Sequence, residues 1–519
     1  MSLSAIHFKA KSKTLESTEV VVGKDILELL ANAMYVDPLT IYREYIQNAA
    51  DSIDEARQVG LDVDDPQIHI YLDHGSRTVR IRDNGSGIGN SEFVKRITAI
   101  GASHKRGTDL RGFRGVGRLS GLGYCQELVF RGKAVGDARV IEVSWNGRAL
   151  REKVRDIGYA GSLTSIISEV VTYTESPATE KSERFFEVEM RKVGRLRNDL
   201  LMNEQLIRNY ISQVAPVPFD PRFEFGDQIQ TFLTDRGVSP PIHIELNDNA
   251  GPIYHRVRND IEFNPKVTDF VRSVDCFDIV NDAGETAAFG WIAEHAYLGA
   301  VPKRLGFGGI RLRAGNIQVG DESLLATLYP EQRFAAWTIG DIHVSSKKIV
   351  PNGRRDDFEH NVHYAWLQSE LGIKASGLAH RIRSSSQQRQ HLRTVHISFQ
   401  AIDEWLDLAK HKDTPLLLKH ALLDLTNDNL QFAEKETAKL TDGGDEHATA
   451  TNRLNRLTKK IEVLNAKIGV QRGSSDLGFS KATEKALVKA LKVVLSNARS
   501  AKVGNKTAMD IVAAVSSPA

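Results

Sequence analysis

The most regular pattern of apolar positions lies near the amino end of the chain. Five apolar residues recur there at steps of three or four: Ile41, Tyr45, Ala49, Ile53 and Ala56. This spacing predicts a helix with one buried face over about residues 39–58. Residues 67–73 and 77–83 then alternate apolar and polar positions, which predicts a β-hairpin that turns at residues 74–76.

Further elements are expected on both sides of this region. An extended arm over residues 1–24 precedes a helix at Asp25–Ala33. A helix is expected at 91–99, followed by strands at 126–134, 138–145 and 162–172. This order of elements predicts an α+β fold that begins with a two-layer α/β sandwich, in which helices cover one face of a mixed sheet.

Two changes of pattern predict the domain boundaries. Prolines cluster near residues 217–221, and strand-like segments then dominate until about residue 350. Near residue 360 the pattern becomes helical. The predicted domains are residues 1–215, a middle domain at 216–360 and a helical region at 361–519.

The helical region contains a short heptad seam, in which apolar residues step by 3, 4, 3 and 4: Leu454, Leu457, Ile461, Leu464 and Ile468. The simpler interpretation is a helical hairpin packed within its own domain. A dimerising coiled-coil segment is the alternative.

Composition narrows the functional classes. The chain has 519 residues and a net charge of +2, so no overall excess of positive charge indicates nucleic-acid binding. The two cysteines, Cys125 and Cys276, are far apart and form no recognisable zinc motif, which favours a reducing compartment. No apolar run is long enough to span a membrane. We therefore expect a cytoplasmic protein.

The candidate chemistry lies on the first predicted helix and on the loop after the hairpin. Glu44 and Asn48 are one helical turn apart, and Asp51 follows on nearly the same face. Such a face can hold a general base beside a magnesium ligand. The loop Asp83-Asn-Gly85-Ser-Gly87 lets the backbone approach a ligand closely. Taken alone, this loop is equally compatible with an ordinary turn.

Together these segments resemble the GHKL (Bergerat-fold) ATPase superfamily, which includes DNA gyrase, histidine kinases, MutL and the heat-shock chaperones. The helix with Glu44, Asn48 and Asp51 is most similar to that of the ninety-kilodalton heat-shock chaperones. The resemblance implies an ATPase that uses ATP and Mg²⁺. It implies that Asn48 coordinates the metal, and that Glu44 activates the attacking water.

The resemblance also assigns roles to the loop. Asp83 would accept a hydrogen bond from the adenine amino group, and Gly85 and Gly87 would leave room for the base and ribose. A later strand normally brings a threonine to the adenine side, and Thr164 or Ser165 is the candidate, although the match is poor.

Residues 101–120 are interpreted as a glycine-rich, basic lid over the phosphates. The expected phosphate contacts are the backbone of a short glycine segment and two nearby cations: Gly115, Val116, Gly117, Lys105 and Arg118. The lid combines features similar to MutL with features similar to the chaperones. Some of its arginines are expected to be merely solvated.

The middle domain is expected to resemble the β-α-β transducer domain that follows the nucleotide domain in related enzymes. There a cation reaches the γ-phosphate, where it compensates developing negative charge. Arg354 or Arg355 is the first candidate, and Lys347 is the second; surface residues at a domain edge are the alternative. A second basic segment, Lys303–Arg313, could meet a polyanion, line an interface or simply solvate a strand.

Two functions from different classes remain open. The first is an ATP-driven molecular clamp that resembles a heat-shock chaperone, with lid closure, N-terminal pairing into a homodimer, and protein clients. The second is a clamp similar to MutL or the MORC proteins, in which ATP gates closure around DNA. Near-neutral charge and the chaperone-like helix favour the first, and the MutL-like lid favours the second. A nucleotide sensor that does not hydrolyse ATP is a third reading, against which an intact Glu44 argues.

Overall fold

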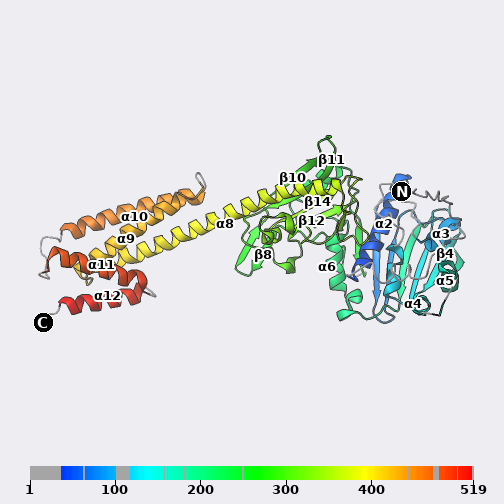
Figure 1. The fold of residues 1–519 in the computed structure, drawn as a ribbon, viewed down its shortest axis with the longest axis horizontal. Coiled ribbons are helices and arrows are strands. Elements are labelled where there is room, and N and C mark those ends of the chain that lie inside the picture. Colours follow the sequence, from blue (N-terminus) through cyan, green and yellow to red (C-terminus); the bar gives the residue numbers. More distant parts are fainter. Residues whose placement is uncertain are drawn as a thin grey trace, which may run out of the picture. The chain divides into compact units, whose positions relative to one another are not determined.

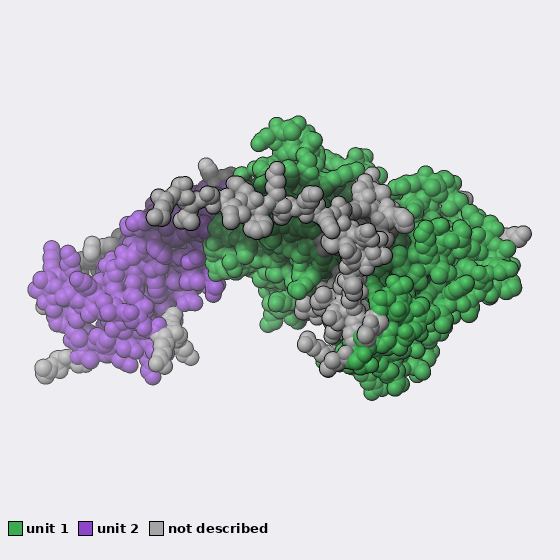
Figure 2. Space-filling view, turned by 45° about the vertical axis from the view of Figure 1, so that its right-hand side comes forward, with its two compact units in different colours: residues 1–379 green, residues 380–519 purple. Residues whose placement is uncertain are grey.

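The computed structural model describes residues 37–61, 65–100, 117–156, 158–159, 162–180, 182–247, 251–441, 445–470, 479–498 and 501–516. The expected arm at 1–24, the expected helix at 25–33, and Lys105, Gly115 and Val116 lie outside these ranges. The chain forms two compact units, Met1–Ala379 and His380–Ala519 (Figure 2). The finer division predicted at 215/216 and 360/361 stays a prediction.

The first unit begins with a seven-stranded sheet of order β5-β4-β3-β6-β2-β1-β7. Neighbouring strands are antiparallel except for β1 and β7, which are parallel. The strands are β1 (Gln67–Asp73), β2 (Thr78–Asp83), β3 (Glu127–Lys133), β4 (Arg139–Asn146), β5 (Val171–Pro177), β6 (Phe185–Arg191) and β7 (His243–Leu246). The α+β fold predicted from the pattern of elements is confirmed in this unit.

The predicted amphipathic helix is α2 (Thr40–Gln58), which packs against β2 and the 3-10 helix η2 (Gly117–Gly123) (Figure 1). All five apolar residues of its periodic pattern are buried, because this face covers the sheet. The remaining helices of this part are α3 (Asn90–Thr98), α4 (Gly147–Arg155), α5 (Leu163–Val170), η3 (Arg197–Met202) and α6 (Glu204–Val214).

The strand predicted at 162–172 is wrong, because residues 163–170 form the helix α5. The hydroxyl of Ser162 caps this helix by accepting a hydrogen bond from the backbone N–H of Ser165 at 3.2 Å. Ile166 and Val170 are one helical turn apart and both are buried. Thr164 and Ser165 therefore lie on a helix, and they do not provide the strand threonine that the resemblance suggested.

The second sheet of the first unit has five strands in the order β10-β11-β14-β12-β13. These are β10 (Ser273–Val280), β11 (Thr286–Glu294), β12 (Gly309–Ala314), β13 (Ile317–Val319) and β14 (Ile339–Val344). The parallel strands β12 and β14 are joined through β13 and the 3-10 helices η5 (Ala326–Leu328) and η6 (Gln332–Trp337). This connection replaces the α-helix of the expected β-α-β unit. Around the sheet lie α7 (Gly226–Thr234), η4 (Lys303–Leu305) and the hairpin of β8 (Asp260–Asn264) and β9 (Val267–Phe270).

The helix α8 (Val362–Lys410) contributes to both units, and the second unit contains only helices among its described residues. The others are α9 (Leu416–Thr437), α10 (Asp445–Val470), α11 (Lys481–Asn497) and α12 (Ala501–Ser516). The predicted heptad seam lies on α10 and is buried in the core of this unit, where α10 packs against α9. This agrees with the packed-hairpin interpretation. In the part of the chain described here, no helix is both long and apolar enough to cross a bilayer.

Candidate functional site

The predicted helix face and loop meet in the first unit. Glu44 and Asp51 are buried on α2, Asn48 is half-buried between them, and Asp83 is buried at the end of β2. The loop after Asp83 is attached directly to the helix, since the backbone N–H of Ser86 donates to the carbonyl of Ser52 at 3.0 Å. The structure therefore brings the two predicted motifs together.

Close packing explains two glycines of this loop. A Cβ atom on Gly85 would lie 2.5 Å from the carbonyl carbon of Ser52, so a side chain there would push the loop away from α2. Gly87 has a φ of +67°, and a Cβ on it would lie 2.1 Å from the carbonyl oxygen of Lys133. Both glycines are needed for contacts within the protein. Their predicted role beside the base and ribose stays a prediction.

Asp83 organises the loop that it begins. Its Oδ1 accepts a hydrogen bond from the backbone N–H of Gly85 at 3.0 Å. Arg184, which sequence reasoning missed, donates from Nε to the carbonyl oxygen of Gly85 at 3.0 Å. Arg184 precedes β6, and β6 pairs with β2, so this contact arises from the pairing of two strands that are far apart in the sequence. No local sequence pattern pointed to it.

Glu44 is enclosed by residues from two distant parts of the chain. Its side chain is only 7% exposed. The Nε of Arg355 lies 3.3 Å from its Oε1, which makes an ion pair between α2 and the loop that follows β14. A Cβ on Gly117 would lie 2.2 Å from Oε2, so the end of the predicted lid packs directly against the carboxylate.

Arg43, the residue before Glu44, attaches the loop that carries Arg354 and Arg355 to α2. Its Nη1 donates to the carbonyl oxygen of Arg355 at 3.3 Å, and its Nη2 donates to that of Arg354 at 3.1 Å. Gly320, which follows β13, donates its N–H to the same Arg355 carbonyl at 2.9 Å. Arg355 itself has a φ of +57°, an uncommon conformation for a residue with a side chain. The loop is therefore held in one shape by contacts from α2 and from the segment after β13.

These contacts separate the three residues predicted to supply a cation to the γ-phosphate, because only one of them has its side chain next to Glu44. The guanidinium of Arg355 is buried against Glu44, whereas the side chain of Arg354 is exposed and only its carbonyl oxygen meets Arg43. Lys347 is also exposed. Arg43 is adjacent to Glu44 in the sequence, but sequence reasoning missed its role, because it binds a carbonyl oxygen 312 residues away.

The described end of the lid is tied to α2 by Tyr45. The Tyr45 hydroxyl accepts a hydrogen bond from the N–H of Gly121 at 2.9 Å and donates to the carbonyl oxygen of Arg118 at 3.2 Å. The Arg118 side chain points back to the carbonyl oxygen of Ala99. Burial, helped by the nearby positive charge of Arg96, lowers the pKa of Arg118 to about 10. In this arrangement Arg118 is occupied by the protein, and its phosphate contact stays a prediction.

The predicted basic segment at Lys303–Arg313 is not a continuous surface. Arg311 and Arg313 are buried in the first unit, because both faces of β12 are covered by other parts of the protein. Arg313 forms an ion pair from Nε to Oδ1 of Asp341 at 3.1 Å. The prediction that this segment could bind a polyanion is therefore wrong for Arg311 and Arg313, which are buried.

The residues present fit ATP and Mg²⁺. Within the described part of the chain, Glu44 Oε1 and Gln47 Oε1 are buried without a hydrogen-bond donor, although Arg355 lies close enough to Glu44 for an ion pair. A water molecule or polar ligand group would satisfy such oxygens. The half-buried carboxamide of Asn48 offers the hard oxygen ligand that Mg²⁺ prefers.

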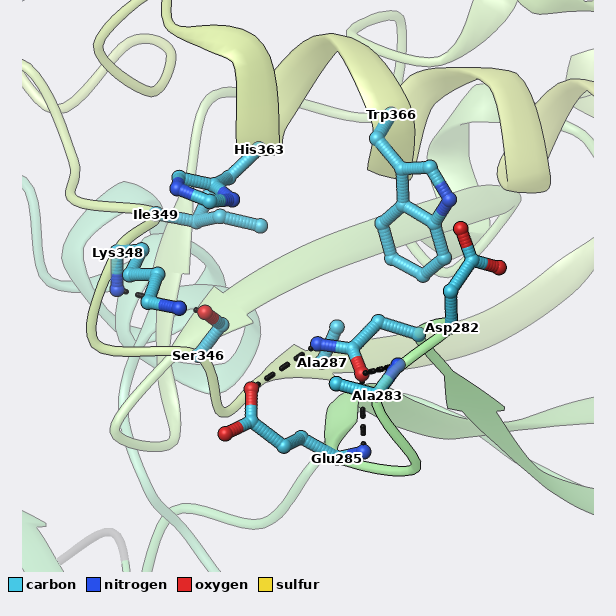
Figure 3. A pocket seen from close by; sticks show the side chains of 10 residues that line it. Asp282, Ala283, Glu285, Ala287, Ser346, Lys348, Ile349, His363 and Trp366 are labelled. Carbon is cyan, nitrogen blue, oxygen red and sulfur yellow. Dashed lines mark hydrogen bonds between the residues drawn. The ribbon is translucent and has the colours of Figure 1, made fainter.

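A separate cavity of about 310 Å³ lies beside the turn between β10 and β11 and the first turns of α8 (Figure 3). His363 and Trp366 of α8 line one side, and Asp282 of the turn and Lys348 line others. None of the predicted nucleotide residues contributes to it. This cavity therefore does not belong to the Glu44 site.

Comparison with known proteins identifies the class of the N-terminal region. Residues 40–165 match the family model described as histidine kinase-, DNA gyrase B-, and HSP90-like ATPase. This stretch holds α2, the β1–β2 hairpin, the Asp83 loop and the lid. The chain therefore contains a GHKL-type ATPase domain, as the motifs predicted.

The relatives are bacterial chaperones. Chaperone protein HtpG of Chromobacterium violaceum is 26% identical over 278 residues, which cover 49% of this chain and 38% of that protein. HtpG of Nitrosococcus oceani is 32% identical over 130 residues, or 22% of this chain and 20% of that protein. HtpG of Mycobacterium avium is 36% identical over 88 residues, or 16% and 14%. The chain is thus distantly homologous to the HtpG (Hsp90-family) chaperones, and the match spans at most 38% of the length of these three relatives.

Proposed function

We propose that this chain is a Mg²⁺-dependent ATPase in which Glu44 is the general base and Arg355 is the cation that meets the γ-phosphate. The observation that supports this most directly is the buried Arg355–Glu44 ion pair at 3.3 Å. It places a permanently charged guanidinium beside the carboxylate that the GHKL motif assigns to water activation. Both groups come from one chain, so the pairing needs no second subunit.

The chain's own residues suggest how the site is switched on. While Arg355 pairs with Glu44, the guanidinium lies against Oε1 of the carboxylate and occupies the place that an attacking water would take. The phosphates of ATP carry more negative charge than one carboxylate and would draw the guanidinium away from Glu44. Glu44 would then be released to take a proton from water. Bound Mg²⁺ would supply neutralisation of the phosphate oxygens.

Asp83 and Asn48 are assigned the binding roles in this proposal. Asp83, buried and fixed by the Gly85 N–H, would recognise the exocyclic amino group of adenine. Asn48 would hold the metal, with Asp51 behind it. Lid closure by residues 101–120 and pairing into a homodimer belong to the same proposal and rest on the resemblance to the chaperones.

Protein clients are the favoured substrates of the clamp, because the relatives found are named chaperones. The alternative, a clamp that acts on DNA like MutL or MORC proteins, concerns a different use of the same ATPase cycle. ATPase assays with and without DNA over a salt series distinguish the two. Stimulation by DNA that salt removes would favour the alternative.

The test of the ATPase proposal compares the two adjacent arginines. Arg355→Gln keeps most of the side-chain volume and removes the charge, so we expect kcat for ATP hydrolysis to fall by about 10²–10³-fold with nearly unchanged ATP affinity. Arg354→Gln is the matched control and should change kcat less than about threefold, a bound set by its exposed position.

Glu44→Gln completes the test. It should abolish turnover while ATP binding, measured by calorimetry, persists. Circular dichroism verifies that each variant is folded. Turnover that survives in Glu44→Gln, or an equal loss in Arg354→Gln and Arg355→Gln, would contradict the proposed roles.

A further inference from the structure

The electric charge of this chain is distributed very unevenly between its two compact units. Residues 380–519 contain 22 Lys and Arg against 15 Asp and Glu, a net charge of +7. Residues 1–379 contain 46 against 51, a net charge of −5. The near-neutral total of +2 therefore hides a basic helical unit (purple in Figure 2). Such asymmetry is typical of proteins that bind polyanions through one part of the chain.

The positive charge is concentrated on one side of α10. Five cations lie on this helix after residue 450: Arg453, Arg456, Lys459, Lys460 and Lys467. All five are exposed. At 100° per residue they fall within a sector of about 120°, next to the buried heptad seam. Glu462 is the one acidic residue of this stretch, and it projects about 120° away from the centre of the sector.

The neighbouring helix α8 extends this basic surface. Arg453 and Lys460 approach Asp403 of α8, with Nη2–Oδ2 and Nζ–Oδ1 distances of 2.9 and 3.3 Å. His396 precedes Asp403 by seven residues and so shares its face of α8, whereas Arg393, ten residues before Asp403, lies about 80° to one side; both are exposed. Between Leu371 and Ile402 the sequence contains no Asp or Glu. Asp403 thus neutralises part of this surface, and Asp407, which is exposed one turn further along the same face of α8, pairs with Lys410.

An exposed cationic helix face is often only a solvated surface, so the arrangement has to be compared with that expectation. A solvated face usually mixes both signs of charge, since opposite charges four residues apart stabilise a helix. Here α10 places like charges three or four residues apart at positions 453, 456, 459 and 460, which costs helix stability. An anionic partner with evenly spaced charges would offset that repulsion.

We propose that the α8–α10 face of the helical unit binds the phosphate backbone of a nucleic acid. Arg453 and Lys467 are 14 residues apart, so the row of cations is about 21 Å long, which matches about six phosphates along one DNA strand. Phe399, which lies beneath Arg453, is buried and cannot stack on a base, so we expect binding to depend on charge and not on sequence. This inference does not rest on the ATPase proposal, because it concerns a different compact unit.

The test uses the full chain and a fluorescein-labelled 20-base-pair DNA duplex of random sequence, with fluorescence anisotropy between 50 and 200 mM salt. Single-stranded DNA and RNA of equal length form two further arms. We expect binding that weakens with salt. The triple variant Arg456→Gln/Lys459→Gln/Lys467→Gln should lose at least about tenfold in affinity and about two to three units of the slope of log K against log salt.

The matched control removes the same charge from another helix of the same unit. Lys481, Lys485 and Lys489 are exposed on α11, and their triple change to Gln should leave affinity and slope nearly unchanged. If the α11 control weakens binding as much as the α10 variant, net charge and not this face is responsible, and the proposal fails. It also fails if no nucleic acid binds, or if poly-glutamate binds the α10 face while nucleic acid does not. The helical content from circular dichroism and the thermal unfolding transition of the helical unit serve as the folding check for both variants.

Discussion

At the scale of single residues, the position of Glu44 depends on a charged neighbour and on a glycine that has no side chain. Glu44 is confined between Arg355 and the Cα of Gly117. Position 117 tolerates no Cβ without movement of the carboxylate, because Oε2 would be only 2.2 Å away. The glycine therefore fixes the place of the proposed base, a role that differs from cradling a phosphate.

Gly117→Ala tests this placement. The Cβ would meet the flexible end of Glu44 and not the backbone, so we expect a small change in stability and a fall in kcat of about tenfold or more. Steady-state ATPase kinetics measure the change. Gly377→Ala on α8 is the control, because a Cβ there has open space, and it should keep full activity. Normal turnover in Gly117→Ala would show that Glu44 does not need its observed position.

At the scale of elements, β14 carries a buried charge network that links the second sheet to helix α6. Arg313 of β12 donates from Nη2 to the carbonyl oxygen of Gln213 at the end of α6, at 2.8 Å, and pairs with Asp341 of β14. Burial alone would raise the pKa of Asp341, but the Arg313 guanidinium and His255 hold it well below its usual range. This network therefore joins β12 and β14 to the end of α6.

His343, two residues further along β14, predicts an acid-sensitive fold. Burial, reinforced by Arg313, lowers the pKa of His343 to about 3. Between about pH 3 and the unfolded value near 6.5, the unfolded chain binds a proton that the folded chain does not. Proton binding by the unfolded chain therefore lowers the free energy of unfolding as the pH falls from about 6.5 towards 3, and above pH 6.5 this effect of His343 is absent. The slope from this group is at most about 1.4 kcal/mol per pH unit.

Urea unfolding followed by tryptophan fluorescence measures this effect, since four of the five tryptophans lie in the first unit. His343→Leu should flatten the pH dependence between pH 4 and 6. His411→Leu removes a histidine that is exposed in the second unit and should leave the slope unchanged. An unaltered slope in His343→Leu would mean that other groups cause the acid sensitivity.

At the scale of the whole molecule, the two compact units are expected to respond differently to nucleotide. Every described residue of the proposed ATP site lies in the first unit, and α8 is the element that contributes to both. A ligand stabilises the part of a protein that binds it. Nucleotide should therefore raise the unfolding transition of the first unit and leave that of the helical unit in place.

Differential scanning calorimetry with Mg²⁺ and a non-hydrolysable ATP analogue tests this expectation. At one hundred times the dissociation constant, the stabilisation should be about 2.7 kcal/mol for the first unit. Asp83→Asn, which replaces one carboxylate oxygen with an NH₂ donor while the other oxygen can still accept from the Gly85 N–H, should abolish the shift. A shift that persists in Asp83→Asn would remove the adenine role of this aspartate.

The sequence by itself determined the parts whose information is local. The steps of three and four in α2, the alternation in β1 and β2, and the polar loop at Asp83 each depend on neighbours within a few turns of chain. These patterns were sufficient to predict the α+β fold and the helix with Glu44, and the resemblance of the motifs to a known superfamily predicted the GHKL class. Local evidence failed at residues 162–172, where apolar content suggested a strand and the Ser162 cap produced a helix instead.

Tertiary structure decided which residues meet. Arg354 and Arg355 are indistinguishable as neighbours in a sequence, yet the contact of Arg43 with both carbonyls turns only the second side chain towards Glu44. Arg311 and Arg313 similarly became interior residues because β12 is covered on both faces. Periodicity reports which side of an element is apolar, whereas the partner of a buried charge is set by packing between segments hundreds of residues apart.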